Sequence, residues 1–293
     1  MSTARILSLT SLAMIAFACN SLLCRVALKH TSIDPASFTA VRLSAGAGTL
    51  WLIAALGHRG RVGKGHWASA LALFVYAAGF SFAYVSLPAS VGSLLLFGAV
   101  QATMIARGLW LGERLGGLQL LGLGLALAGL IGLLLPGVSA PPLLGAGLML
   151  SAGFAWGIYS LRGKGTGDPI RVTAGNLLRT VPLALALSLL MRGHASLDAA
   201  GCAAAVASGA LASGLGYAIW YTALPGLRAT TAATVQLSVP VLAAFGGIAF
   251  LGEHLTPRLG LASVAILGGI ALVILKRRHA SLPQSFALAA PGD

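Results

Sequence analysis

The chain has 293 residues, of which 57% are hydrophobic and 9% are charged, whereas soluble domains carry about 25% charged residues. Ten membrane spans of about 20 residues each would occupy about 200 residues, which leaves short loops and excludes an autonomous soluble catalytic domain. A formal net charge of +13 would suggest a nucleic-acid partner in a soluble chain, so the positions of the basic residues decide its meaning.

Apolar stretches long enough to cross a bilayer follow one another along the whole sequence. Short segments with glycine, proline and charged residues separate them. The predicted helices cover residues 6–28, 35–56, 67–87, 89–111, 116–136, 142–161, 171–191, 200–222, 228–251 and 257–275. The sequence therefore predicts an all-α membrane protein with ten transmembrane helices.

The basic residues fall mainly on one side of this predicted bundle. That side receives both termini and every second connection, with Arg5, Arg59, Arg61, Lys64, Arg107, Arg114, Arg162, Lys164, Arg171, Arg228, Lys276, Arg277 and Arg278. The other side has only Lys29, Arg192 and Arg258 clearly in loops. Because positive loops stay in the cytoplasm, we expect a cytoplasmic (inner) membrane protein with both termini inside. The basic excess then contacts membrane lipid, and no nucleic-acid partner is needed.

Two segments of the chain recur about 137 to 140 residues later. The sequence GFSFAYVSLP at 79–88 returns as GYAIWYTALP at 216–225, and LGERL at 111–115 returns as LGEHL at 251–255. The pattern predicts a five-helix repeat at 1–138, a second at 139–279, and a disordered cytoplasmic tail at 280–293. Because five is odd, the second repeat enters the membrane from the opposite side. Inverted repeats are typical of secondary transporters whose midplane site opens to either face.

This arrangement resembles a known family. The five-plus-five inverted helices, the two Leu-Gly-Glu turns, and Pro88 and Pro225 resemble the ten-helix EamA-type branch of the drug/metabolite transporter superfamily. Within that branch, the length and the aromatic-lined helices are most similar to the bacterial aromatic amino acid exporters. The resemblance implies a central cavity lined by the first, third, fourth, sixth, eighth and ninth helices. It also implies alternating access, and such a bundle requires no oligomer.

Acidic residues and histidines are missing from the middle of the predicted spans. All six acidic residues and all six histidines fall at helix ends or in loops. The four-helix multidrug members of the superfamily exchange protons through a glutamate in their first helix, whereas the corresponding stretch here, IAFACNSLLCR, has none. We therefore expect a neutral or zwitterionic small-molecule substrate and no carboxylate-driven proton antiport.

Catalysis inside the membrane would need a nucleophile with a positioned base, a set of metal ligands or a carboxylate pair. The predicted spans contain none of these, and the sequence has no phosphate-binding glycine fingerprint. We expect no enzyme, no catalytic residue, no cofactor and no metal site. The expected function is export of a small metabolite, with aromatic amino acids foremost. The alternatives are a transporter of another metabolite, a channel-like facilitator and an intramembrane enzyme.

Six charged residues near predicted helix ends suggest two ionic latches that close alternately. The latch expected at the outer face consists of Arg25, Arg42 and Glu253. The latch expected at the inner face consists of Arg162, Arg179 and Glu113. In the alternative interpretation, Gly112 and Gly252 end one helix and each glutamate then compensates the positive N-terminal end of the next. The arginines would in that case extend to lipid headgroups.

Aromatic side chains at helical spacing form the candidate substrate site. One face of the helix at 67–87 carries Tyr76, Phe80 and Tyr84 at i, i+4 and i+8. The second repeat carries Tyr217 and Tyr221 at the last two of these positions, and Trp156 and Tyr159 lie on a neighbouring helix. Such rings can stack on a planar side chain or attract an ammonium group. They can equally pack against other helices or form an interfacial belt.

Neutral amides inside the spans form the second part of the candidate site. Asn20, Gln101, Asn176 and Gln236 carry donors and acceptors that must be satisfied within the membrane. We expect Asn20, Gln101 and Gln236 to bind the amino and carboxylate groups of a zwitterion. The alternative role of each amide is a hydrogen bond between helices.

Overall fold

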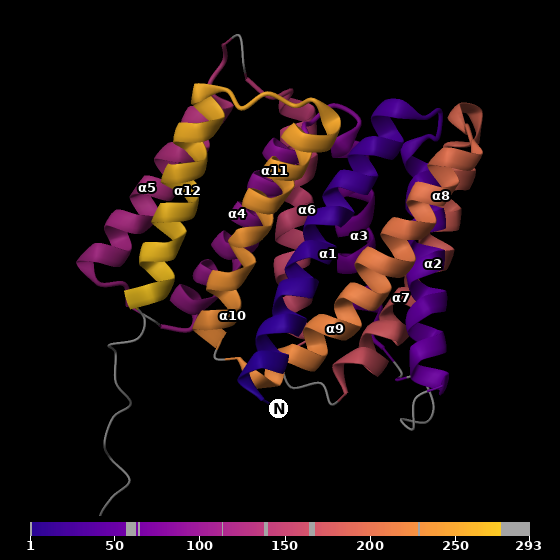
Figure 1. Cartoon of the computed structure of the whole chain (residues 1–293), viewed down its shortest axis with the longest axis horizontal. Coiled ribbons are helices and arrows are strands. Elements are labelled where there is room, and N and C mark those ends of the chain that lie inside the picture. The colour runs from indigo at the N-terminus through magenta and orange to yellow at the C-terminus, as the bar shows by residue number, and fades with distance from the viewer. Residues whose placement is uncertain are drawn as a thin grey trace, which may run out of the picture.

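The computed structural model describes residues 2–56, 63, 65–112, 114–137, 140–163, 168–227 and 229–276, which are helical apart from short connections (Figure 1). Within them, ten segments are long and apolar enough to cross a membrane. The first half contains α1 (Thr3–His30), α2 (Pro35–Leu56), α3 (Trp67–Tyr84), α4 (Ala89–Trp110) and α5 (Gly117–Leu134). The second half begins with α6 (Leu143–Arg162) and α7 (Pro169–Leu190).

The eighth and ninth spans are each built from more than one helical segment. The eighth consists of α8 (Ala199–Ala207), a π-helical segment η2 (Ser208–Leu215) and α9 (Gly216–Ala223). The ninth consists of α10 (Ala229–Gln236) and α11 (Ser238–Leu251), and α12 (Pro257–Lys276) is the tenth. Short 3₁₀ turns, η1 (Arg192–His194) and η3 (Leu224–Gly226), flank the eighth span.

The predicted all-α fold with ten spans is confirmed, and the predicted helix ends lie within three residues of those observed. Two predicted helices differ in their interiors, and the first of them, at 200–222, contains the π-helical segment η2. The segment expected as a single helix at 228–251 is interrupted at Leu237. Pro240 explains the interruption because it lacks the N–H that would bond the carbonyl of Gln236 four residues earlier.

The two five-helix halves run in opposite directions through the bundle. We call the side that carries the start of α1 the N-terminal face. The end of α6 lies at this face, because Arg162 Nε donates to Ser69 Oγ near the start of α3 at 3.2 Å. The start of α6 lies at the opposite face, where Gly145 packs against Ser86 and Leu87 just after α3. The sixth span therefore runs opposite to the first, and the repeats are inverted.

The two halves pack against each other along several helix pairs. Helix α3 lies against α6, α2 against α7, and α5 against α12 (Figure 1). In the α5–α12 pair, a Cβ atom on Gly122 would lie 2.6 Å from the carbonyl oxygen of Gly269, and Gly122 constrains Gly269 in the same way. The backbones thus approach directly, which is the close packing that small residues permit in a membrane.

The helix ends are fixed by aspartate caps and by glycines. Asp34 Oδ1 accepts hydrogen bonds from the N–H groups of Ala36 and Ser37 at 2.9 Å, and Asp34 Oδ2 accepts from Ser196 N at 3.0 Å. Partial burial alone would raise the pKa of Asp34, but these hydrogen bonds outweigh it and lower the pKa. Gly112 (φ 88°) and Gly252 (φ 63°) adopt positive φ angles at the ends of α4 and α11, as predicted.

The described basic residues follow the predicted two-sided pattern. The N-terminal face receives Arg5, Arg107, Arg114, Arg162, Arg171 and Lys276, whereas Lys29, Arg192 and Arg258 lie toward the opposite face. Some predicted features lie outside the described residues, namely Glu113, the tail at 280–293, and Arg59, Arg61, Lys64, Lys164, Arg228, Arg277 and Arg278.

Candidate substrate-binding site

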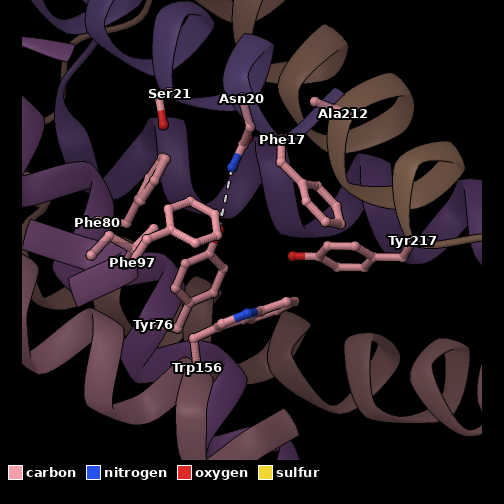
Figure 2. Close-up of a pocket in the computed structure, with 10 residues that line it drawn as sticks. Phe17, Asn20, Ser21, Tyr76, Phe80, Phe97, Trp156, Ala212 and Tyr217 are labelled. Atoms are coloured by element: carbon pink, nitrogen blue, oxygen red, sulfur yellow. Dashed lines mark hydrogen bonds between the residues drawn. The ribbon is translucent and has the colours of Figure 1, made fainter. Parts of the chain in front are cut away.

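A small cavity lies at the centre of the bundle, between α1, α3, α4, α6, η2 and α9 (Figure 2). Its volume of about 20 Å³ is close to the space that one water needs. The lining residues are Phe17, Asn20, Ser21, Tyr76, Phe80, Leu96, Phe97, Trp156, Ala212 and Tyr217. Five of the predicted substrate-binding residues therefore meet at one place. The ninth span, which the family resemblance also implied, contributes none of these described lining residues.

The aromatic side chains form one continuous cluster through the bundle. The helical spacing on α3 stacks Tyr84, Phe80 and Tyr76 in order, with ring centroids 4.7 and 5.5 Å apart. Tyr76 then contacts Trp156 at 4.8 Å, and Trp156 contacts Tyr217 at 5.2 Å. Figure 2 shows Tyr217 from the second repeat with its hydroxyl directed toward the rings on α3. Tilted and edge-on contacts of this kind stabilise aromatic pairs beyond their buried area.

Of the predicted amides, Asn20 is the one that lines the central cavity. Its Nδ2 donates to Tyr76 Oη at 3.3 Å (Figure 2), and its Oδ1 accepts from Ser208 Oγ at 2.6 Å. Gln101 is buried on α4 but lines neither this cavity nor the larger one described next. Gln236 Nε2 donates to Ala232 O within its own helix at 3.4 Å, and Gln236 lines neither cavity.

A larger cavity of about 300 Å³ opens at the N-terminal face, and we call it the vestibule. Small-molecule pockets start at about this size. Its lining residues are His66, Ser69, Tyr159, Arg162, Gly163, Pro169, Val172, Thr173, Asn176 and Tyr221. Tyr159 Oη donates to Thr173 Oγ1 at 3.0 Å, and the Tyr159 ring lies 5.5 Å from Trp156. The rings of Tyr159 and Trp156 therefore connect the vestibule wall to the central cluster.

At the opposite face, hydrogen bonds and an ion pair converge on Glu253. Its carboxylate accepts hydrogen bonds from Ala89 N at 2.7 Å and from Ser90 Oγ at 3.1 Å. Arg25 Nε lies 3.9 Å from the same carboxylate, and Arg25 Nη1 donates to Tyr84 O at 2.8 Å. These contacts join α1, the turn between α3 and α4, and the turn between α11 and α12. Glu253 thus compensates the positive N-terminal end of α4, not that of the following helix.

The remaining arginines of the predicted latches lie in different surroundings. Arg42 does not contact Glu253. Its guanidinium lies 4.8 Å from the ring centroid of Phe80, and its Nη2 donates to Ala77 O at 3.2 Å. Arg179 Nη1 donates to Gly175 O in its own helix at 2.9 Å. The predicted partner of Arg162 and Arg179, Glu113, lies outside the described residues.

The helix caps give a better alignment of the two repeats around Arg42. Asp34 and Asp168 cap α2 and α7, and each precedes a proline. Counting eight residues from each aspartate places Asn176 at the position of Arg42, three residues before Arg179. The two repeats are therefore 134 residues apart at this point (176 − 42), whereas GFSFAYVSLP and GYAIWYTALP are 137 apart (216 − 79). The shared Asp-Pro pair was the sequence signal for this alignment.

The π-helical segment η2 is a part of the site that sequence reasoning missed. Ala212 lines the central cavity, Ser208 binds Asn20, and Gly209 packs directly against the carbonyl of Arg42. π-helical turns are rare and occur often at functional sites. The local sequence SGALASGLG consists of small and apolar residues. Its hydropathy pattern would be the same for an α-helix and a π-helix, so it did not predict the π-helical turn.

Comparison with known proteins identifies the family. The model of the EamA-like transporter family matches residues 4–135 and again residues 143–275. The chain belongs to this family. The two matched segments correspond to the two five-helix halves of the fold, so this EamA-like transporter is a multi-pass membrane protein built from two related units. The family resemblance predicted from the repeats and the Leu-Gly-Glu turns is confirmed.

Two relatives of this EamA-like transporter are named as exporters. An uncharacterized protein of Pseudomonas aeruginosa is 60% identical over 274 residues, covering 93% of this chain and 96% of its own. The threonine/homoserine exporter RhtA of Escherichia coli strain K12 is 36% identical over 137 residues, 44% of this chain and 45% of RhtA. A probable terminal-alkyne amino-acid exporter of Streptantibioticus cattleyicolor is 29% identical over 211 residues, 68% of this chain and 70% of its own.

A solved crystal structure has the same fold. It covers 95% of this chain and 100% of its own, with a TM-score of 0.67 and 19% sequence identity. At that identity the likeness concerns the fold alone. The family and its relatives are transporters, which agrees with the expectation that this chain is not an enzyme.

Proposed function

We propose that this EamA-like transporter exports small neutral or zwitterionic metabolites, foremost aromatic amino acids, across the cytoplasmic membrane by alternating access. The observation that carries the proposal is a central cavity lined by aromatic rings and one amide, with a vestibule at one face and a closed opposite face. Both termini and the vestibule are then cytoplasmic, because the basic residues gather at that face. A single chain suffices for transport.

The chemistry of the cluster suits an amino acid with an aromatic side chain. Tyr76, Trp156 and Tyr217 present ring faces and edges around the cavity, which favours stacking on a planar group. The same rings attract an ammonium group. Asn20 offers an amide beside them. The present conformation, with the vestibule open at the N-terminal face, then faces the cytoplasm.

A second candidate substrate is a small aliphatic amino acid. Two relatives favour it, since one exports threonine and homoserine and another is a probable exporter of a terminal-alkyne amino acid. The same central site would then hold a short side chain against the rings. A panel of substrates separates the two candidates. Counterflow and saturation separate either carrier from a channel-like facilitator, and unaltered substrate separates it from an enzyme.

The test is uptake of labelled amino acids into proteoliposomes that contain the purified protein. We expect saturable counterflow, with phenylalanine, tyrosine and tryptophan preferred over threonine. Trp156→Leu should raise the KM for phenylalanine about tenfold, because it removes ring contacts at the cavity. Phe154→Leu is the matched control, since Phe154 lies on the same helix with 47% of its surface exposed. Equal uptake of all amino acids, or equal effects of both variants, would contradict the proposal.

A further inference from the structure

Arg42 is a cation buried inside the bundle. It lies seven residues into α2, a depth of about 10 Å along the helix, and only 2% of its surface is exposed. A charged side chain at such a position is costly, and in membrane proteins it usually marks a functional site. The sequence placed Arg42 in a gate, but its surroundings differ from those of the gate residues.

The charge of Arg42 is only partly compensated by the protein. Nη2 donates one hydrogen bond to Ala77 O, and the guanidinium lies over the rings of Phe80 at 4.8 Å and Tyr76 at 5.7 Å. Within the described part of the chain, Nη1 has no hydrogen-bond partner. The ion pair found there joins Arg25 to Glu253 instead. Arg42 therefore has a free donor and no described counter-charge.

Arg42 adjoins the central cavity. The rings of Tyr76 and Phe80 on which it stacks are themselves part of the cavity wall. A molecule that displaced the Phe80 or Tyr76 ring would lie where that ring lies now, 4.8 or 5.7 Å from the guanidinium.

We propose that Arg42 recognises the carboxylate of the transported molecule. This inference rests on the proposed function and deepens it, because it narrows the neutral or zwitterionic substrates to zwitterions that carry a carboxylate and excludes simple amines. The planar guanidinium has the geometry to bind both oxygens of a carboxylate. Binding would supply the counter-charge that the described protein does not. The aromatic rings then hold the side chain of the same molecule.

The experiment measures binding to the purified protein by isothermal titration calorimetry. The probes are L-phenylalanine, 3-phenylpropionate, which lacks the ammonium group, and phenethylamine, which lacks the carboxylate. We expect the wild-type protein to bind both carboxylates and to bind phenethylamine at least tenfold more weakly. Arg42→Gln should weaken 3-phenylpropionate about 10- to 100-fold, the value of one charge-assisted contact.

Two further variants separate recognition from folding. Arg42→Lys keeps the charge without the planar fork, so 3-phenylpropionate should bind with intermediate affinity. Arg258→Gln is the matched control, because Arg258 donates to the carbonyls of Gly132 and Leu135 at the far end of α5. It should leave all three affinities unchanged.

The outcomes distinguish this inference from the proposed function. Equal wild-type affinity for phenethylamine and 3-phenylpropionate overturns the carboxylate assignment even if amino acids are exported. Full binding of 3-phenylpropionate by folded Arg42→Gln protein also overturns the assignment. Where that variant does not fold, the comparison of the probes on the wild-type protein decides. Arg42-dependent binding of 3-phenylpropionate without any amino-acid transport supports the assignment and overturns the proposed substrate.

Discussion

The contacts of Glu253 predict how the closed face can be opened. Replacing Glu253 by glutamine keeps one carbonyl oxygen for Ala89 N but removes the charge that faces the start of α4 and Arg25. Hydrogen bonds to charged groups contribute about 1.5–3 kcal/mol, and neutral ones about 1 kcal/mol. With the helix-end interaction of up to about 1 kcal/mol, the closed state should lose about 1–3 kcal/mol. That loss shifts the equilibrium toward an open face about 5- to 150-fold.

Cysteine accessibility measures this shift. In a background with Cys19, Cys24 and Cys202 replaced by alanine, Ser93→Cys places a thiol at a buried position one turn beyond Ser90. Its rate of reaction with a water-soluble maleimide should rise 5- to 150-fold when Glu253→Gln is added. Arg258→Gln, a neutralised charge elsewhere at the same face, is the control and should leave the rate unchanged. Unaltered labelling in the Glu253→Gln protein would refute the view that these contacts close the face.

Three further predictions concern packing, capping and the central amide. Gly153→Ala should lower the free energy of unfolding by about 1–3 kcal/mol, because the new Cβ would lie 2.6 Å from Ala99 Cβ. Gly147→Ala is the control and should not lower it, because nothing lies within 4 Å of the new Cβ. Equal thermal midpoints for the two variants would contradict this prediction. Asp34→Ala should cost about 1 kcal/mol at pH 7. Because the pKa of Asp34 is lowered in the folded protein, the wild-type protein should have its full stability advantage over Asp34→Ala above about pH 3.9, and should lose it as the pH falls through the folded pKa. A difference in the free energy of unfolding that does not depend on pH would contradict this. Asn20→Leu leaves two buried hydroxyls without their amide partner and should destabilise the protein by about 1–3 kcal/mol, as measured by thermal unfolding; an unchanged midpoint would show that the amide is dispensable.

Most of the fold was predictable because the membrane imposes a simple rule on the sequence. Each span must satisfy its backbone internally and present apolar side chains for about 20 residues, so hydropathy locates the ten helices. The glycines that end α4 and α11 were also predictable from the local sequence, because glycine readily adopts the positive φ angle at a helix end. The break at Leu237 follows from Pro240, but whether a proline bends or interrupts a helix depends on its neighbours, as the continuous α7 with Pro182 shows.

The candidate site was predictable only where one helix determines it. The spacing of Tyr76, Phe80 and Tyr84 places them on one face of α3 without any tertiary information. The partners of Arg42 and Glu253 depend on how separate helices pack, and this packing cannot be predicted from a local sequence pattern. Glu253 contacts the start of α4, 163 and 164 residues away in sequence. The contact of the π-helical segment η2 with α2, where Gly209 lies against the carbonyl of Arg42, is likewise a contact between separate helices.

The meeting of Gly122 and Gly269 constrains how the two halves of this chain can diverge. Gly122 lies on α5 and Gly269 on α12, which are the last spans of the two halves. Each glycine leaves no space for a methyl group on the other. A substitution in either copy therefore acts on both at once, and a compensating change in the partner cannot create room because neither residue has a side chain to shorten. This pair of positions should stay glycine in descendants that keep the pairing, however far their transport specificities drift apart.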